Sequence, residues 1–411
     1  MGLHRFRPPP SGRMGTLWTL GSIRNAVLLE FGCMGHILYS RVALSRAGTG
    51  GCKFYSTHID ELDISFGDTE RLRRALAELV RYEKPRLIFL SPSAVPEVIG
   101  TDLPALCREL QREYPRTRLL PFGCGGFDAG FYQGVRETLL QLVKNLPVDR
   151  GIAEAPAFNL IGSCADLFRF RSDAEEFIRI MAGAFGMKPL CVLSSDTTTE
   201  QIEQMGGARI NLVIRREGEA AAKHLQEHFG TPYLFARPYG TKATVQWIRR
   251  IGEIAGIAPE EDFIAAQVRE AETLSAQCGA SLSHLLREQP EALKLSLGGH
   301  ADIVKGIMAF GCGELSFPRG ICWCDDPEMA GADVPYFSED KWARALEEQK
   351  GGLFMASGEA LAWAGRNRAL QISNPDLSWR VNPYEPPFTG FRGALHLLDL
   401  WINEAMENRP L

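Results

Sequence analysis

Short apolar runs alternate with amphipathic segments along almost the whole chain of 411 residues. The runs have the length of buried strands, and the segments after them space their apolar residues as one face of a helix does. This rhythm is typical of parallel sheets whose strands are connected by helices. It predicts an α/β fold with strands over residues 25–31, 86–91, 157–162, 189–194, 210–214, 232–236, 352–356 and 370–373.

Helix signals support the same interpretation. In "DTERLRRALAELVRYEKP" the N-cap residue is Asp68, an acidic residue occupies the first turn, and Pro85 follows the end. "EGEAAAKHLQEHFG" is closed by Gly230. A long helical stretch is expected over residues 259–288. Because it separates two groups of strands, it marks the start of a further unit.

The pattern predicts three Rossmann-like domains in series. A proline at each end of residues 147–156 indicates the first boundary, and the long helical stretch indicates the second. The expected limits are an N-terminal arm over 1–20, α/β domain I over 21–150, α/β domain II over 151–260, and a long helix plus α/β domain III over 261–411. The arm is rich in proline and arginine, so no core of its own is expected there.

Composition excludes several classes of function. A formal net charge of -5, with both signs interspersed, provides no basic surface for nucleic acid. No apolar run reaches the roughly 18 residues that span a bilayer, and the first residues lack the apolar core of a secretory signal. We therefore expect a cytoplasmic protein without membrane or nucleic-acid partners. Its ten cysteines are expected to be mostly thiols.

Cys33 stands out in "VLLEFGCMGHILYSR" because it lies between two glycines where a predicted strand ends and a helix begins. Sites in parallel α/β folds lie at the carboxyl ends of strands, and a helix amino terminus there favours a thiolate by lowering the thiol pKa. The glycines let a bulky group approach the backbone, so a metal-cluster ligand is reasonable. A buried structural cysteine in a strand-to-helix turn is the alternative.

Two further strand ends are expected at the same edge. "SPSAVPEVIGTDL" (residues 91–103) follows one, and "PFGCGGFDAGFYQG" (residues 121–134) follows the other and carries Cys124 between glycines. Asp128, in that second turn, is an oxygen ligand or a helix cap. Cys52 in "GTGGCKFYS" is also glycine-flanked and is a reserve metal ligand. Neither turn has a phosphate-loop or dinucleotide signature, so ATP and NAD binding are not expected.

Several motifs, taken together, carry a resemblance. "FGCMGHILYSR" resembles the cluster-cysteine turn of the nitrogenase component 1 type oxidoreductase family, and "STHIDELDISFGDTERLRRAL" and "SPSAVPEVIGTDL" are similar to two stretches that follow it there. "FNLIG", "INLVIRREGEAAAKHLQEHFGTPY" and "PPFTGFRGALHLLDLWINE" resemble the later patterns. The family contains nitrogenase subunits, cofactor-assembly scaffolds and tetrapyrrole reductases. The resemblance covers nearly the whole chain from Gly21, in the right order.

The resemblance implies two homologous subunits, each with three α/β domains, and an iron-sulfur cluster at their interface. It also implies an ATP-dependent reductase of the iron-protein type as electron donor. Cys33 matches the family's glycine-cysteine ligand, and Cys124 matches a cysteine of some members, which makes domain I the cluster-binding domain. The family's threonine-cysteine ligand position holds Ala94. A [4Fe-4S] cluster is therefore expected rather than an eight-iron cluster, in a homodimer or in a heteromer with a homologous subunit.

The expected active-site end also departs from the nitrogen-reducing subunit. Arg215 and Arg216 occupy the region of its cofactor cysteine, and no histidine precedes "GFRGA" at the cofactor position. Arginine suits an anionic substrate such as a tetrapyrrole carboxylate. The resemblance thus implies a nitrogenase-like reductase component, an oxidoreductase whose catalytic residues the sequence does not identify. A non-catalytic scaffold for metallocofactor assembly is the alternative, and a relic that binds a small molecule without a cluster is a third hypothesis.

Other patterns have two interpretations each. Cys312, Cys322 and Cys324 hold a metal or are core thiols, and no fourth ligand is evident. His224 and His228 are spaced like a metal pair, but a solvated helix face is favoured. His36 either tunes a cluster or is a satisfied core histidine. Residues 238–244 begin a helix that either binds an anion or is an ordinary turn.

Overall fold

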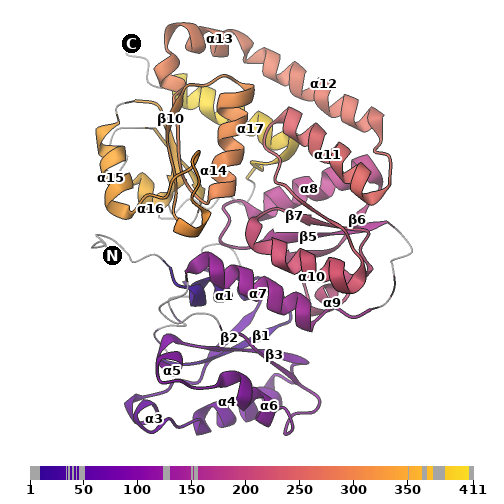
Figure 1. Cartoon of the computed structure of the whole chain (residues 1–411), viewed down its shortest axis with the longest axis vertical. Helices are drawn as coiled ribbons and strands as arrows, with labels where there is room; N and C mark the ends of the chain where they lie inside the picture. Colours follow the sequence, from indigo (N-terminus) through magenta and orange to yellow (C-terminus); the bar gives the residue numbers. More distant parts are fainter. Residues whose placement is uncertain are drawn as a thin grey trace.

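The computed structural model describes residues 10–33, 51–123, 130–149, 156–349, 351–362, 368–373 and 385–406, together with Gly151 and a few positions between 35 and 45. It confirms the α/β class and contains three four-stranded sheets. Every strand pairing in them is parallel. The three units follow one another along the chain, as Figure 1 shows.

The first sheet has the order β2-β1-β3-β4. Its strands are β1 (Val27–Phe31), β2 (Lys53–Ser56), β3 (Leu87–Pro92) and β4 (Arg118–Pro121). Alternate residues of β1 and β3 face opposite sides, because side chains alternate along a strand. One face packs on α4 and α6, and the other joins the central core with α1 and α7. The helices are α1 (Gly12–Gly21), α3 (Glu61–Phe66), α4 (Glu70–Tyr82), α5 (Ala94–Val98), α6 (Leu103–Leu110) and α7 (Phe131–Asn145).

Helix α1 differs from the arm expected over residues 1–20. Every residue from Gly12 to Gly21 is buried. The helix crosses α7 where small residues let the two backbones meet, because a Cβ at Gly134 would lie 1.9 Å from the Gly12 carbonyl oxygen. A Cβ at Gly15 would likewise lie 2.2 Å from the Phe131 carbonyl oxygen. The segment from residue 12 therefore belongs to the core between the first two units, and the other domain limits stay predictions.

The second sheet has the order β6-β5-β7-β8. Its strands are β5 (Ala157–Ser163), β6 (Lys188–Ser194), β7 (Ile210–Val213) and β8 (Tyr233–Phe235). Its helices are α8 (Phe170–Phe185), α9 (Thr199–Glu203), α10 (Glu219–Phe229) and α11 (Thr241–Ala255). Gly230 ends α10 in the left-handed conformation, as the sequence predicts.

The third sheet has the order β10-β9-β11-β12. Its strands are β9 (Leu295–Gly299), β10 (Arg319–Cys324), β11 (Leu353–Ser357) and β12 (Arg368–Ser373). The expected long helix is two helices, α12 (Glu261–Gln277) and α13 (Gly279–Glu288), which meet at Cys278. The remaining helices are α14 (Ala301–Met308), α15 (Glu339–Glu348), α16 (Gly358–Leu361) and α17 (Gly390–Met406). Helix α17 packs against α8, α11, α12 and α13, so the end of the described chain ties the second and third units together.

Candidate functional site: a cysteine rim and a three-unit junction

The rim of the first sheet is built by the residues that follow β1 and β3. Cys33 lies one residue beyond Gly32, and the backbone N–H of Ser93 donates to the Phe31 carbonyl at 2.9 Å. A Cβ at Gly32 would lie 2.3 Å from Ser93 Oγ, so this position requires glycine. Ser93 Oγ is buried and has no hydrogen-bond partner among the described residues. The turn with Cys33 and the one that leads to Ala94 therefore pack directly on each other.

The charge around Cys33 is the opposite of what the sequence predicts. Partial burial, followed by the nearby carboxylates of Glu30 and Glu61, raises the pKa of the Cys33 thiol. The expectation that a helix amino terminus lowers this pKa is therefore wrong for the protein without metal. Carboxylates that disfavour a thiolate also attract a cation. A metal ion bound to the sulfur would lower the pKa of the Cys33 thiol instead.

Glu30 is the buried carboxylate behind this rim. Burial raises its pKa, and the guanidinium of Arg13 in α1 opposes that shift through a salt bridge. Its second oxygen, Oε2, has no hydrogen-bond partner among the described residues. Helix α1 thus supplies the guanidinium that stabilises the ionised form of this buried carboxylate near Cys33.

Cys52 does not join Cys33 at the rim. The register pairs Val27 with Lys53, so Cys52 lies level with Ala26 at the opposite end of the sheet. Seven residues of strand and turn separate that level from Cys33, roughly 20 Å at ~3.3 Å per residue. Cys52 is buried in the central core, and desolvation raises its pKa to about 12. The interpretation of Cys52 as a reserve ligand beside Cys33 is wrong, because parallel strands place the two at opposite edges. Cys124, Asp128 and His36 lie outside the described residues.

A groove of about 640 Å³ borders the same edge of the first sheet, between α3 and the turn that joins α5 to α6. Large apolar side chains stand exposed around it. Phe66 is 83% exposed, Leu62 is 67% exposed and Val98 is 66% exposed. Ile99, in the groove wall, is 45% exposed. Large apolar side chains exposed around one groove are typical of a surface where another protein packs.

A second polar cluster joins all three units. Arg215, in the turn after β7, is 1% exposed. Its Nη1 lies 2.8 Å from both carboxylate oxygens of Asp166, and its Nε donates to Glu217 Oε2 at 2.7 Å. The Cβ that Gly162 lacks would lie 2.6 Å from the Arg215 side chain. The end of β5 is therefore shaped to admit this guanidinium.

Histidine from the third unit completes the ionic network. His300, the N-cap of α14, lies with Nε2 3.0 Å from Glu217 Oε1. Burial disfavours ionisation of Glu217, but Arg215 and His300 outweigh it and hold the Glu217 pKa well below its ordinary value. His300 Nδ1 accepts the backbone N–H of Asp302 at 3.2 Å, so Nε2 carries the proton toward Glu217.

Tyr132 and Asp325 bring the first and third units together beside this network. The Tyr132 phenol donates to Asp325 at 2.9 Å to Oδ2 and 3.1 Å to Oδ1, and its ring meets His300 edge-on at 5.0 Å. Asp325 keeps exposed surface, yet protein crowds it so closely that desolvation raises its pKa despite His300 and Tyr132. It is thus a carboxyl that takes a proton more readily than an ordinary aspartate.

The two arginines predicted to bind an anion differ in their surroundings. The charge of Arg215 is already balanced by two carboxylates, so it organises the junction rather than facing an open site. Arg216 is 38% exposed at its side chain and is paired only loosely with Asp302, at 3.4 Å. Of the two, Arg216 has the geometry to meet a ligand anion.

Sequence reasoning missed most of this junction. Asp166, Glu217, His300 and Asp325 each follow the carboxyl end of a strand, which is where open parallel sheets place ligands. That position was an available signal, but β9 and β10 were not predicted from the sequence. Tyr132 had no local signal, because it lies in the first turn of a helix of another unit.

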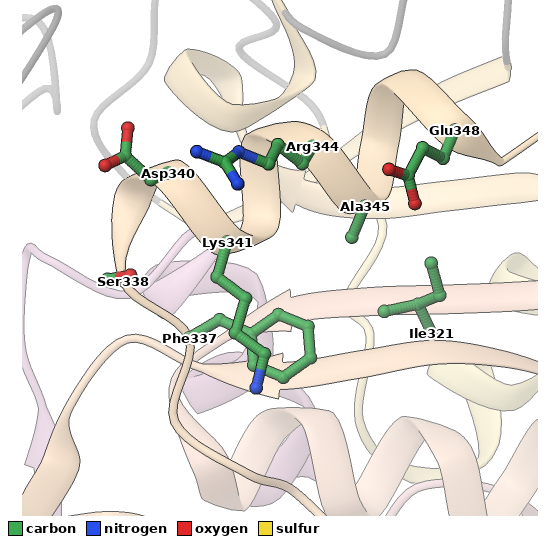
Figure 2. A pocket seen from close by; sticks show the side chains of 8 residues that line it. All are labelled: Ile321, Phe337, Ser338, Asp340, Lys341, Arg344, Ala345 and Glu348. Atoms are coloured by element: carbon green, nitrogen blue, oxygen red, sulfur yellow. The ribbon is translucent and has the colours of Figure 1, made fainter.

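The remaining candidates form no metal site in the part of the chain described. No group of three or more possible ligands occurs there. His224 and His228 stack with ring centroids 3.8 Å apart on α10. The thiol of Cys324 faces the Asp326 and Val334 carbonyls instead of joining Cys312. A further pocket of about 550 Å³ lies beside α15, where Lys341 Nζ sits 4.0 Å from the Phe337 ring centroid (Figure 2).

Comparison with known proteins places this geometry in context. The model of the family described as nitrogenase component 1 type oxidoreductase matches residues 11–304. A light-independent protochlorophyllide reductase subunit of Jannaschia sp. (strain CCS1) is 31% identical over 340 residues, covering 78% of this chain and 62% of that protein. Nitrogenase iron-molybdenum cofactor biosynthesis protein NifE of Clostridium pasteurianum is 26% identical over 253 residues, covering 59% and 53%. The chain thus spans less than two thirds of these relatives' length.

A solved structure shows the same fold. The chain of "Nitrogenase Cp1 at pH 6.5" superposes with a TM-score of 0.76 at 15% identity, covering 99% of this chain and 95% of that one. In the described part of the present chain, no helix is both long and apolar enough to cross a membrane.

Proposed function

Because the chain belongs to the nitrogenase component 1 type oxidoreductase family, we propose that it is the substrate-binding component of a nitrogenase-like reductase. It receives low-potential electrons from an ATP-dependent reductase of the iron-protein type and passes them to a substrate bound among its three units. The observation that carries the proposal is the position of Cys33. It is a partly exposed thiol at the carboxyl edge of a parallel sheet, beside a packed glycine turn and an apolar surface.

An iron-sulfur cluster fits this rim only as a shared group. Such clusters are held by four thiolates, and Cys33 is the one thiol that the described residues bring to this edge. Cys124 supplies the second in our proposal, and a second, homologous subunit supplies the other two. The cluster would provide one-electron transfer between the reductase and the substrate.

The partner subunit packs, in this proposal, on the apolar surface of Leu62, Phe66, Val98 and Ile99. These side chains stand at the same edge of the sheet as Cys33, so a subunit seated on them brings its own ligands to the cluster. The partner is identical or homologous to this chain, in keeping with four thiolates drawn from two equivalent rims.

The substrate site of the proposal is the three-unit junction. A reduction that adds hydrogen to carbon needs a proton for each electron. His300 holds a proton at Nε2, and the Tyr132 phenol, which donates to Asp325 Oδ2, holds another where the three units meet. Arg216 offers a guanidinium to a substrate anion, and a tetrapyrrole carries such carboxylates. The relative from Jannaschia, whose name refers to protochlorophyllide, supports a tetrapyrrole-class substrate.

A metallocofactor scaffold is the second candidate, favoured by the similarity to NifE of Clostridium pasteurianum. Steady-state consumption of an added tetrapyrrole, dependent on the reductase and ATP, supports the enzyme. Release of an intact cluster to an acceptor protein without turnover supports the scaffold. Anaerobic turnover of acetylene or nitrogen by the purified complex refutes the tetrapyrrole assignment.

A further inference from the structure

The apolar groove beside the cysteine rim has acidic walls. It lies between α3 and the turn that joins α5 to α6, and Phe66 and Ile99 are exposed on its two sides. The wall segments, residues 60–70 and 97–102, contain no lysine or arginine. Their acidic residues are Asp60, Glu61, Asp63, Asp68 and Glu70 in the first segment, and Glu97 and Asp102 in the second. The apolar surface is therefore bordered by acidic segments on both sides.

The arginines at the start of α4 do not neutralise this border, because each is already paired with an acid. The pairs are Arg71 with Asp60 and Asp63, Arg73 with Glu109 and Glu113, and Arg74 with Glu70. Glu61, Asp68 and Asp102 are exposed and have no ion pair among the described residues. The charge that is left at the border of the groove is therefore negative.

These three carboxylates lie at the groove itself. Asp102 is one of its lining residues, and Asp68 lies between the lining residues Gly67 and Thr69. Glu61 lies four residues before Ser65, another lining residue, so the two share one face of α3. A protein that fills the groove would therefore meet all three carboxylates.

A second copy of this chain would meet the groove with the same charges. Two identical subunits usually associate through the same patch on each, related by a twofold axis. The two apolar centres would then come together, but the two acidic borders would come together as well. Like charges that face each other across an interface oppose association. A second copy therefore has a suitable apolar centre and an unsuitable border.

A partner with a basic border fits both features. Leu62 and Phe66, four residues apart on α3, offer it an apolar contact on one helix face. Lysine or arginine side chains around its own apolar centre would pair with the exposed carboxylates. An apolar centre with a polar rim is the usual anatomy of a protein interface, and complementary rim charges decide which partner is accepted.

We propose that this surface binds a chain that is homologous to the present one but not identical, and that presents lysine or arginine around an apolar centre. The inference rests on the proposed function, in which a partner subunit completes the cluster, and it selects the heteromer over the homodimer. The acidic border provides the specificity, because it repels a second copy and attracts a basic surface.

Sedimentation of the full-length chain mixed with a charge-reversed copy of itself tests this proposal. Glu61→Lys with Asp68→Lys keeps the apolar centre and makes the border basic, so this variant has the chemistry of the proposed partner. At low salt, it should bind the wild type at least about tenfold more tightly than either protein binds itself. Raising the salt concentration should reduce this difference, because salt screens exposed charges.

Two further variants keep the test decisive. Glu272→Lys with Glu347→Lys reverses two exposed charges on α12 and α15, and should show no gain in binding to the wild type. Glu61→Gln with Asp68→Asn removes the repulsion and should self-associate more tightly than the wild type, even if the lysine variant does not fold. Wild type that binds itself as tightly as it binds the lysine variant, or no association in any mixture, overturns the proposal. Sedimentation does not depend on iron, so a failure of the cluster assignment would leave this result unaffected.

Discussion

The phenol of Tyr132 and the carboxylate of Asp325 connect the first unit to the third at 2.9 Å. Tyr132 lies in the first turn of α7, and Asp325 follows the end of β10, so nearly two hundred residues separate the partners along the chain. The contact lies beside the His300–Glu217–Arg215 network. Assembly of this junction therefore requires all three units to be in place.

Asp325→Asn should stabilise the protein at pH 8 and have little effect at pH 4. Desolvation raises the Asp325 pKa, so the wild-type carboxylate weakens folding as pH rises through that value. The amide removes this charge and still accepts the Tyr132 hydrogen bond. Urea unfolding at both pH values measures the difference. Equal effects of the substitution at both pH values would contradict the assignment, and Asp399→Asn, on an exposed helix face, serves as the control.

Arg215→Met should lower the free energy of unfolding by about 3–5 kcal/mol, because it leaves buried carboxylates without their guanidinium. Asp166 and Glu217 both bind this side chain in the interior. Arg250→Met removes the exposed pair with Glu253 and should cost about 0–1 kcal/mol. Chemical denaturation of the two variants checks the contrast. Similar losses in both would show that the junction is not a buried ionic network.

His396 should make the protein less stable in mild acid. Burial and the guanidinium of Arg169, whose Nη1 is 2.7 Å from His396 Nε2, lower the His396 pKa to about 4. The unfolded chain takes up this proton nearer pH ~6.5, so stability falls as pH drops from there to about 4. His396→Gln keeps an acceptor for Arg169 and does not titrate. Over this pH range, the free energy of unfolding should fall by about 1–3 kcal/mol less in His396→Gln than in the wild type. The same pH dependence of the unfolding free energy in His396→Gln and in the wild type would contradict the prediction.

Gly134→Ala should destabilise the crossing of α1 and α7 by several kcal/mol, at or above the ~1–3 kcal/mol usual for overpacking. The new Cβ would lie 1.9 Å from the Gly12 carbonyl oxygen, and both clashing atoms belong to helix backbones. Gly279→Ala meets nothing within 4 Å and should be neutral or slightly stabilising. Thermal unfolding of both variants distinguishes a specific contact from a general effect of alanine. An unchanged melting temperature in Gly134→Ala would show that the two helix backbones do not touch here.

The sequence predicts the fold where its patterns are strong. Buried strands such as β3 and β5 consist of long apolar runs, and the structure confirms them within a residue or two. Strand β2 has exposed and half-buried residues only, and β9 and β10 contain glycine, so their local signal is weak. Tertiary packing makes these segments strands, which a single sequence does not report.

The candidate sites were predictable only in part. Cys33 has a local signature, since glycines flank it at a strand end. Cys52 also has neighbouring glycines but precedes a strand instead of following one, and only the register reveals the difference. The junction depends on contacts between residues far apart in the chain. Arg215 has a sequence signal. Its partner Asp166, which follows a different strand, has none.

The most direct measurement is iron and acid-labile sulfide content, with the electron paramagnetic resonance spectrum after reduction, on the anaerobically purified protein and its co-purifying subunit. Wild type should hold about two irons per chain, half of a shared four-iron cluster. Cys33→Ser should lose both the iron and the signal, while Cys278→Ser, a change in another partly exposed thiol, should keep them. Full iron content and an unchanged signal in Cys33→Ser would contradict the assignment of Cys33 as a cluster ligand.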